Sequence, residues 1–81
     1  QRSAQTSLKN ARESVEVTAK MVEQAEESAE LYRRRFESGV ILSSELIDVE
    51  NRLTEARMRR AQALSQLNIA RANLLRAFGR L

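Results

Sequence analysis

The chain has 81 residues and a net charge of +3, with 14 Lys and Arg against 11 Asp and Glu. It contains no Cys, His, Pro or Trp, which excludes disulfides, thiol chemistry and the commonest zinc ligands. A chain of this length forms at most one small domain, and no apolar run approaches the roughly 18 residues of a membrane-spanning helix. Only two Gly interrupt the helix-favouring composition.

The first half of the chain predicts one long helix over about residues 3–38. Apolar residues recur at alternating spacings of four and three, which is the heptad pattern of helices that pack side by side. The positions are Ala4, Leu8, Ala11, Val15, Thr18, Val22, Ala25, Ala29, Tyr32 and Phe36. Thr18 is the only polar member. Arg33, Arg34 and Arg35 end this arm, where cations either complement the helix dipole or bind a partner.

A turn is expected at residues 39–43. Gly39 can take the left-handed conformation that ends a helix, and Ser43 or Ser44 can cap the next one. Val40, Ile41 and Leu42 are apolar where a loop between helices is usually polar. They either fold back under the helices or face a partner, because exposed apolar groups mark interaction sites.

The second half predicts another helix over about residues 44–78. Its heptad positions are Leu42, Leu46, Val49, Leu53, Ala56, Arg60, Ala63, Leu67, Ala70, Leu74 and Ala77. A second stripe follows one residue further on: Ala61, Leu64, Asn68, Arg71, Leu75 and Phe78. Two stripes indicate either neighbours on both sides or one wide face covered by a third helix. The sequence thus predicts an all-α fold: a single long antiparallel helical hairpin over residues 1–81, packed as a coiled coil.

The residues that carry chemistry do not converge. Ser and Thr are the only nucleophile candidates and no His could activate them, so we expect no enzyme activity, no metal site and no cofactor. Glu45 and Asp48 share a helical face, where capping explains them better than catalysis. The basic residues are spread rather than gathered on one face, so we expect no nucleic-acid binding.

One stretch carries a family resemblance. Residues 33–57, RRRFESGVILSSELIDVENRLTEAR, resemble the periplasmic hairpin of TolC-type outer-membrane efflux proteins. That family shows an aromatic residue, two variable residues and a Gly, then an acidic residue six positions later and an Asp nine positions later. Here these are Phe36, Gly39, Glu45 and Asp48. The flanking arms match as well, so the likeness covers most of the chain and thins toward Gln1.

The resemblance implies a function. Members of the family are trimers whose hairpins form a hollow α-barrel across the periplasm, so this hairpin would be one stave of such a barrel. The hairpin tips meet a periplasmic adaptor protein, which links the tube to an inner-membrane transporter. By position, Gly39, Val40, Ile41, Leu42 and Ser43 would face the adaptor. Glu45 and Asp48 match acidic positions that line the channel entrance in some members.

The resemblance also sets the expected context. Family members reach the outer membrane through a β-barrel, whose strands we do not expect in these residues. The chain is therefore expected to be one periplasmic hairpin of a larger envelope protein or a helical relative. The opening QRSAQTSLKN has no apolar core, so any export signal is expected elsewhere. Two alternatives stay open: the hairpin of the periplasmic adaptor itself, and a generic coiled-coil interaction module.

Overall fold

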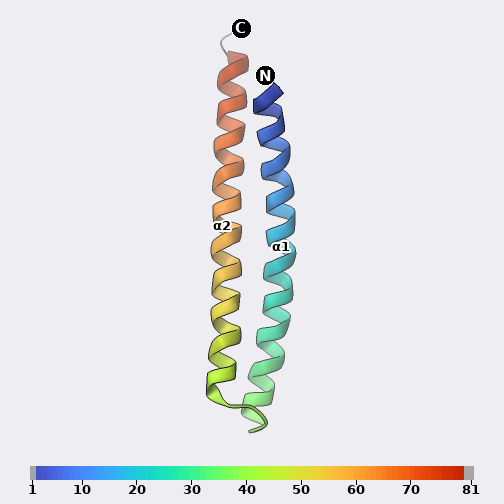
Figure 1. Ribbon diagram of the computed structural model, residues 1–81, viewed down its shortest axis with the longest axis vertical. Helices are drawn as coiled ribbons and strands as arrows, with labels where there is room; N and C mark the ends of the chain where they lie inside the picture. The colour runs from blue at the N-terminus through green and yellow to red at the C-terminus, as the bar shows by residue number, and fades with distance from the viewer. Residues whose placement is uncertain (1, 80–81) are drawn as a thin grey trace.

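The protein is a hairpin of two long helices. The structure, a computed structural model, describes the backbone of residues 2–79 and the side chains of residues 5–79. Helix α1 spans Arg2–Glu37 and helix α2 spans Ser43–Gly79. They lie antiparallel and side by side along a rod of 64 × 13 × 13 Å. Residues 38–42, the connecting segment, join them at one end of the rod, and the start of α1 and the end of α2 lie at the other end (Figure 1). The expected all-α helical hairpin is confirmed.

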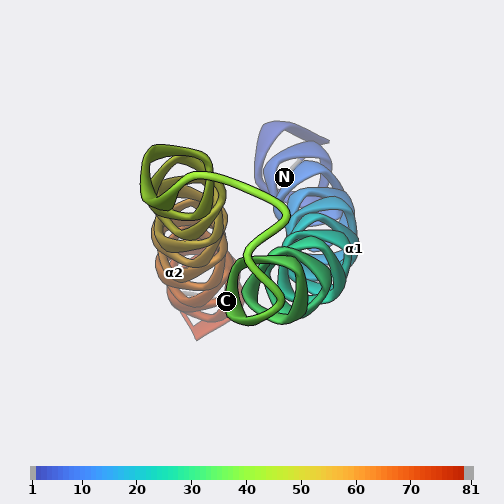
Figure 2. The ribbon, with the colours of Figure 1, turned by 90° about the horizontal axis from the view of Figure 1, so that it is seen from below.

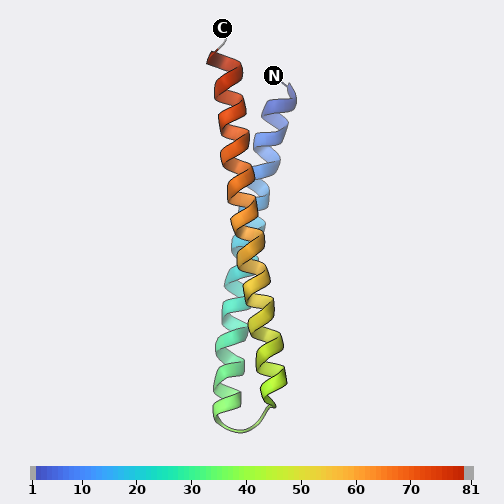
Figure 3. The ribbon, with the colours of Figure 1, turned by 90° about the vertical axis from the view of Figure 1, so that its left-hand side faces the viewer.

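The heptad positions form the interface between the helices. In α1 the seam residues Ala11, Val22 and Ala29 are buried, and those between them are half-buried. In α2 the buried residues are Val49, Leu53, Ala56, Ala63, Leu67 and Ala70. The side chain of Ala4 lies outside the described residues. Figure 3 shows the helices exchanging sides along the rod, as expected when a seven-residue repeat makes two helices coil around each other.

Three seam positions remain exposed. Phe36 and Leu42 lie at the connecting segment, where the opposite helix has ended, so their side chains are 42% and 69% exposed. Arg60 is also exposed, which lets its charged head reach water. Among the described residues, the heptad pattern therefore predicts burial along the rod except at Arg60 and at the tip, where one helix has no partner.

The interface divides into two clusters. Toward the connecting segment, Ala29, Val49 and Leu53 are packed with Ala25 and Tyr32. Toward the chain ends, Ala11, Leu67 and Ala70 are packed with Leu8 and Val15. We call these two parts of the rod the tip half and the terminal half. Most buried positions are Ala, so the helices approach closely but bury little apolar surface.

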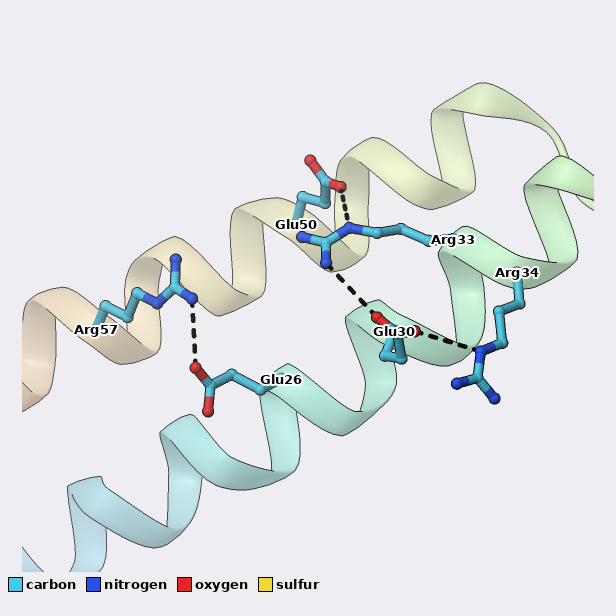
Figure 4. Close-up of polar contacts among 6 residues, drawn as sticks. All are labelled: Glu26, Glu30, Arg33, Arg34, Glu50 and Arg57. Atoms are coloured by element: carbon cyan, nitrogen blue, oxygen red, sulfur yellow. Dashed lines mark hydrogen bonds and ion pairs between the residues drawn. The ribbon is translucent and has the colours of Figure 1, made fainter.

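Ion pairs mark one long face of the rod, the ion-pair face. Arg33 Nε donates to Glu50 Oε1 at 3.0 Å, and Arg57 and Glu26 are 3.3 Å apart, so both pairs join α1 to α2 (Figure 4). Because positions seven residues apart share a side of a coiled-coil helix, Leu64, Arg71 and Phe78 follow Arg57 along this face of α2.

The opposite long face is the groove face. Two shallow grooves open on it between the helices. Their α1 lining includes Ser7, Ser14, Met21 and Ser28, and their α2 lining includes Arg52, Arg59, Gln66 and Ile69. The short side chains of Ser7, Ser14 and Ser28 leave space on the α1 side of the grooves. The second stripe of α2, which the sequence predicts to need a neighbour, lies exposed on the other side of that helix.

Candidate docking site at the hairpin tip

Residues 38–42 connect the helices, and a Schellman motif begins the turn. The Gly39 amide donates to the Phe36 carbonyl at 3.0 Å, and the Val40 amide donates to the Arg35 carbonyl at 2.9 Å. These are the two hydrogen bonds of the motif, with Gly39 at the position that requires positive φ. Its φ is 76°, as the sequence predicts for this glycine. Both carbonyls are therefore paired where the chain leaves α1. Figure 2 shows the connection running from the end of α1 across to the start of α2.

Val40 occupies the next position of the motif and has no apolar partner there. A Schellman motif usually packs this residue against the side chains five or six positions earlier. Those residues here are Arg35 and Arg34, both charged, and Val40 remains 72% exposed. Local structure therefore does not account for an apolar side chain at this position.

Leu42 lies immediately before α2, at a position that normally favours a polar residue. Its carbonyl accepts from the amides of Glu45 at 3.1 Å and Leu46 at 3.4 Å, which makes Leu42 the N-cap residue. The expectation that Ser43 or Ser44 caps the helix is wrong, because the helix already begins at Ser43. Ser, Thr, Asp or Asn at the N-cap stabilises a helix by about 1 kcal/mol relative to an apolar residue. Leu42 forgoes this stabilisation and is 69% exposed.

The three apolar residues of the turn therefore do not behave alike. Ile41 is half-buried, whereas Val40 and Leu42 point largely into solvent. Phe36, in the last turn of α1, adds a third exposed apolar side chain. We call Phe36, Val40 and Leu42 the tip patch. The sequence places Phe36 in the heptad seam and in the family motif but not among the adaptor-facing residues, although its position in the last turn before Gly39 was a usable signal.

Two carboxylates lie beside the tip patch on α2. Glu45 lies in the first turn, where a negative charge is stabilised by the helix dipole. Asp48 follows one turn later, and both side chains are exposed. Neither takes part in an ion pair within residues 5–79. They are available to a partner that brings positive charge to the end of the rod.

The three arginines beside the tip, Arg33, Arg34 and Arg35, each contact another side chain of the same chain. Arg33 binds Glu50 and lies 3.9 Å from Glu30, whose other oxygen is 3.3 Å from Arg34 (Figure 4). The Arg35 guanidinium lies 5.7 Å from the centre of the Tyr32 ring, a distance typical of a cation–π contact. These contacts favour a structural role for the cluster over recruitment of a partner.

Other kinds of site find little support in the described part of the chain. Within residues 2–79, no group of three or more acidic side chains is placed to hold a metal ion. None of the helices described there combines the length and apolarity needed to cross a membrane. The tip patch is thus the feature that most needs a functional explanation.

Comparison with known proteins adds one match. The model of a family described as outer membrane efflux protein matches residues 2–80, which is nearly the whole chain. Searches of curated proteins and of solved structures each returned no match.

Proposed function

The chain belongs to the outer membrane efflux protein family, and from this premise we propose that it is a periplasmic hairpin of an efflux or secretion channel. In this proposal the hairpin is one stave of an α-barrel in a trimeric channel. Its tip docks to a periplasmic adaptor protein, which connects the channel to an inner-membrane transporter.

The exposure of Val40 and Leu42 is the observation that best supports docking at the tip. Both are apolar and at least two-thirds exposed. Val40 lacks the apolar contact that its place in the Schellman motif usually makes, and Leu42 lies at an N-cap, where Ser, Thr, Asp or Asn would stabilise the helix. Apolar groups kept exposed at the end of a rod, against the preference of local structure, support a role in binding a partner. Gly39, Ile41 and Ser43 complete the proposed adaptor-facing segment.

Glu45 and Asp48 are proposed to line the entrance of the channel. The support is their exposure, their lack of internal ion pairs and their place on one side of the first turns of α2. Carboxylates around a narrow opening attract cations and repel anions. We therefore propose that Glu45 and Asp48 attract cationic solutes or bind basic groups of the adaptor, rather than stabilising the hairpin through ion pairs.

The family match favours the channel over the two alternatives. An adaptor hairpin would belong to a different family, and a generic coiled-coil module would give no reason for an apolar tip. The rod shape alone does not separate these possibilities, because all three predict a helical hairpin.

The test removes the tip patch without weakening the hairpin. In the full protein that contains this hairpin, Val40→Asp with Leu42→Asp places charge on the patch, and Asp at the N-cap is expected to stabilise α2. We expect efflux of a fluorescent substrate from cells to fall to the level of cells that lack the protein. Thermal unfolding of the isolated hairpin should show an unchanged or higher Tm.

A matched control is Met58→Asp, which changes another exposed apolar residue of α2 far from the tip. This variant should transport normally. Wild-type efflux by the tip variant at normal expression would overturn the docking proposal, as would an equal loss in the Met58→Asp variant.

A further inference from the structure

A weakly packed segment separates the two apolar clusters of the interface. Val22 and Ala63 are buried in it, yet neither belongs to the cluster of the tip half or to that of the terminal half. Thr18 and Arg60, the polar members of the two heptad seams, lie in the same segment. We call these four residues the central segment. They occupy the middle of the rod, where the two halves meet.

The register of the two helices places these residues opposite one another. The ion pairs of the tip half and the contacts of the terminal cluster fix which positions of α1 and α2 face each other. By that register, Thr18 lies opposite Ala63, and Val22 lies opposite Arg60. Neither pair contains a leucine, whereas each cluster has one, Leu53 or Leu67. Because hydrophobic stabilisation scales with buried apolar area, the central segment holds the helices together less strongly than either cluster.

The two polar side chains of the central segment do not join the helices. The Thr18 hydroxyl donates to the carbonyls of Ser14 at 2.8 Å and Val15 at 3.1 Å, so its hydrogen bonds stay within α1. Bonds of this kind slightly destabilise a helix and often bend it. Arg60 is exposed, and its long side chain can carry the charge into water. Among the described residues, neither side chain has a hydrogen bond or ion pair to the opposite helix.

We propose that the central segment divides the hairpin into two units that open separately, so that the helices of the terminal half can part while those of the tip half stay together. Parts of a protein open as separate cooperative units where the contacts between them are fewest. The ion pairs of Arg33 with Glu50 and of Glu26 with Arg57 lie on the tip side of this border and reinforce that side.

This device goes beyond the proposed function, because it is a property of the hairpin and not of what docks at its tip. It lets the spacing of the helices change in one half of the rod without disturbing the tip patch in the other half.

Single-cysteine variants test where the opening stops, since the chain has no Cys of its own. Ala70→Cys, Ala63→Cys and Val49→Cys place a thiol at positions that are 7%, 4% and 6% exposed in the wild type. A buried thiol reacts with an aromatic disulfide reagent only when its surroundings open, so the rate measures local opening. In the 81-residue chain, Ala70→Cys and Ala63→Cys should react at similar rates, and Val49→Cys about tenfold more slowly.

Removing the two polar residues should remove the border. Thr18→Val with Arg60→Leu, made in the Ala63→Cys chain, extends the apolar contact across the central segment. The reaction of the thiol should then slow to the rate of Val49→Cys, and the Tm of the hairpin should rise.

Thr54→Val with Arg71→Leu, in the same Ala63→Cys chain, is the matched control. The Thr54 hydroxyl also donates to a carbonyl of its own helix, that of Glu50, at 3.1 Å. Thr54 and Arg71 are exposed and lie outside the heptad seam, so the thiol should react as fast as in the Ala63→Cys chain alone.

Three results would contradict the inference. Ala63→Cys reacting far more slowly than Ala70→Cys would mean that opening fades gradually along the rod. Val49→Cys reacting as fast as Ala63→Cys would mean that the hairpin opens as one unit. An unchanged rate after Thr18→Val with Arg60→Leu would mean that these residues do not set the border. None of these variants alters the tip patch, so docking at the tip is tested independently.

Discussion

The tip half and the terminal half of the rod differ in how their two helices are joined. The tip half packs Ala29, Val49 and Leu53 together and joins its helices by two ion pairs, Arg33 with Glu50 and Glu26 with Arg57. Among the described residues, the terminal half has a comparable apolar cluster but no ion pair between the helices. It also exposes most of the large apolar side chains of α2 beyond residue 60.

This difference predicts that the two halves contribute unequally to the stability of the hairpin. The proposed docking at the tip would be helped by helices that are joined close to the tip patch, as they are in the tip half. Both halves expose large apolar side chains, including Ile47 in the tip half and Leu75 in the terminal half. Because the terminal half has no ion pair between its helices among the described residues, we expect it to open locally more readily than the tip half.

The largest expected effect on the free energy of unfolding comes from removing one buried leucine from each half, which tests directly whether the two halves differ in stability. Leu53→Ala should lower the free energy of unfolding by about 2–3 kcal/mol, because it empties a buried position in the tip-half cluster. Leu67→Ala should lower it by less in dilute solution, because the terminal half frays locally before the whole hairpin unfolds. Urea unfolding followed by circular dichroism measures both losses. Equal losses would show that the two halves unfold as one unit.

The glycine of the turn should give the next largest effect. Gly39→Ala meets no atom within 4 Å but must adopt a φ near 76°. The left-handed conformation is less favourable for Ala by about 1 kcal/mol, so we expect a loss of that size in the free energy of unfolding. Gly79→Ala is the matched control, since it too meets open space but has no positive φ. A Gly39→Ala variant as stable as the control would show that the turn relaxes away from the Schellman motif.

The ion pairs between the helices should give the smallest effect. The side chains of Arg57 and Glu26 are 58% and 53% exposed, so water and salt screen their attraction. A double-mutant cycle with Glu26→Gln and Arg57→Gln should give a coupling below about 1 kcal/mol that disappears at high salt. Glu55 and Arg59, an exposed pair within α2, provide the reference cycle. A coupling of several kcal/mol would mean that the ion pairs, and not the packing, set the two halves apart.

Much of this molecule follows from local sequence pattern alone. The absence of Pro, the heptads and Gly39 are enough to specify two helices and a reversal between them, because each acts over one or two turns. Every buried residue in the described part of the chain lies at one of the predicted heptad positions. The exposure of Leu64, Leu75 and Phe78 follows from the same pattern, since a two-helix rod can cover only one stripe on each helix.

The tertiary structure decided what the pattern left open. The sequence alone did not determine whether Val40, Ile41 and Leu42 fold under the rod or face outward. In the structure Ile41 turns inward, while Val40 and Leu42 remain exposed. The hydrogen bonds that close α1 and open α2 fix these directions, and they move the N-cap from a serine to Leu42.

The faces of the rod are likewise a tertiary result. Which flank of α1 lies beside which flank of α2 depends on the register that the short connection imposes. That register brings Glu26 to Arg57 and Ser14 to Ile69, residues far apart in the chain. Helix propensity and apolar spacing act within a few residues and carry no information about such pairings, so only the packed hairpin determines them.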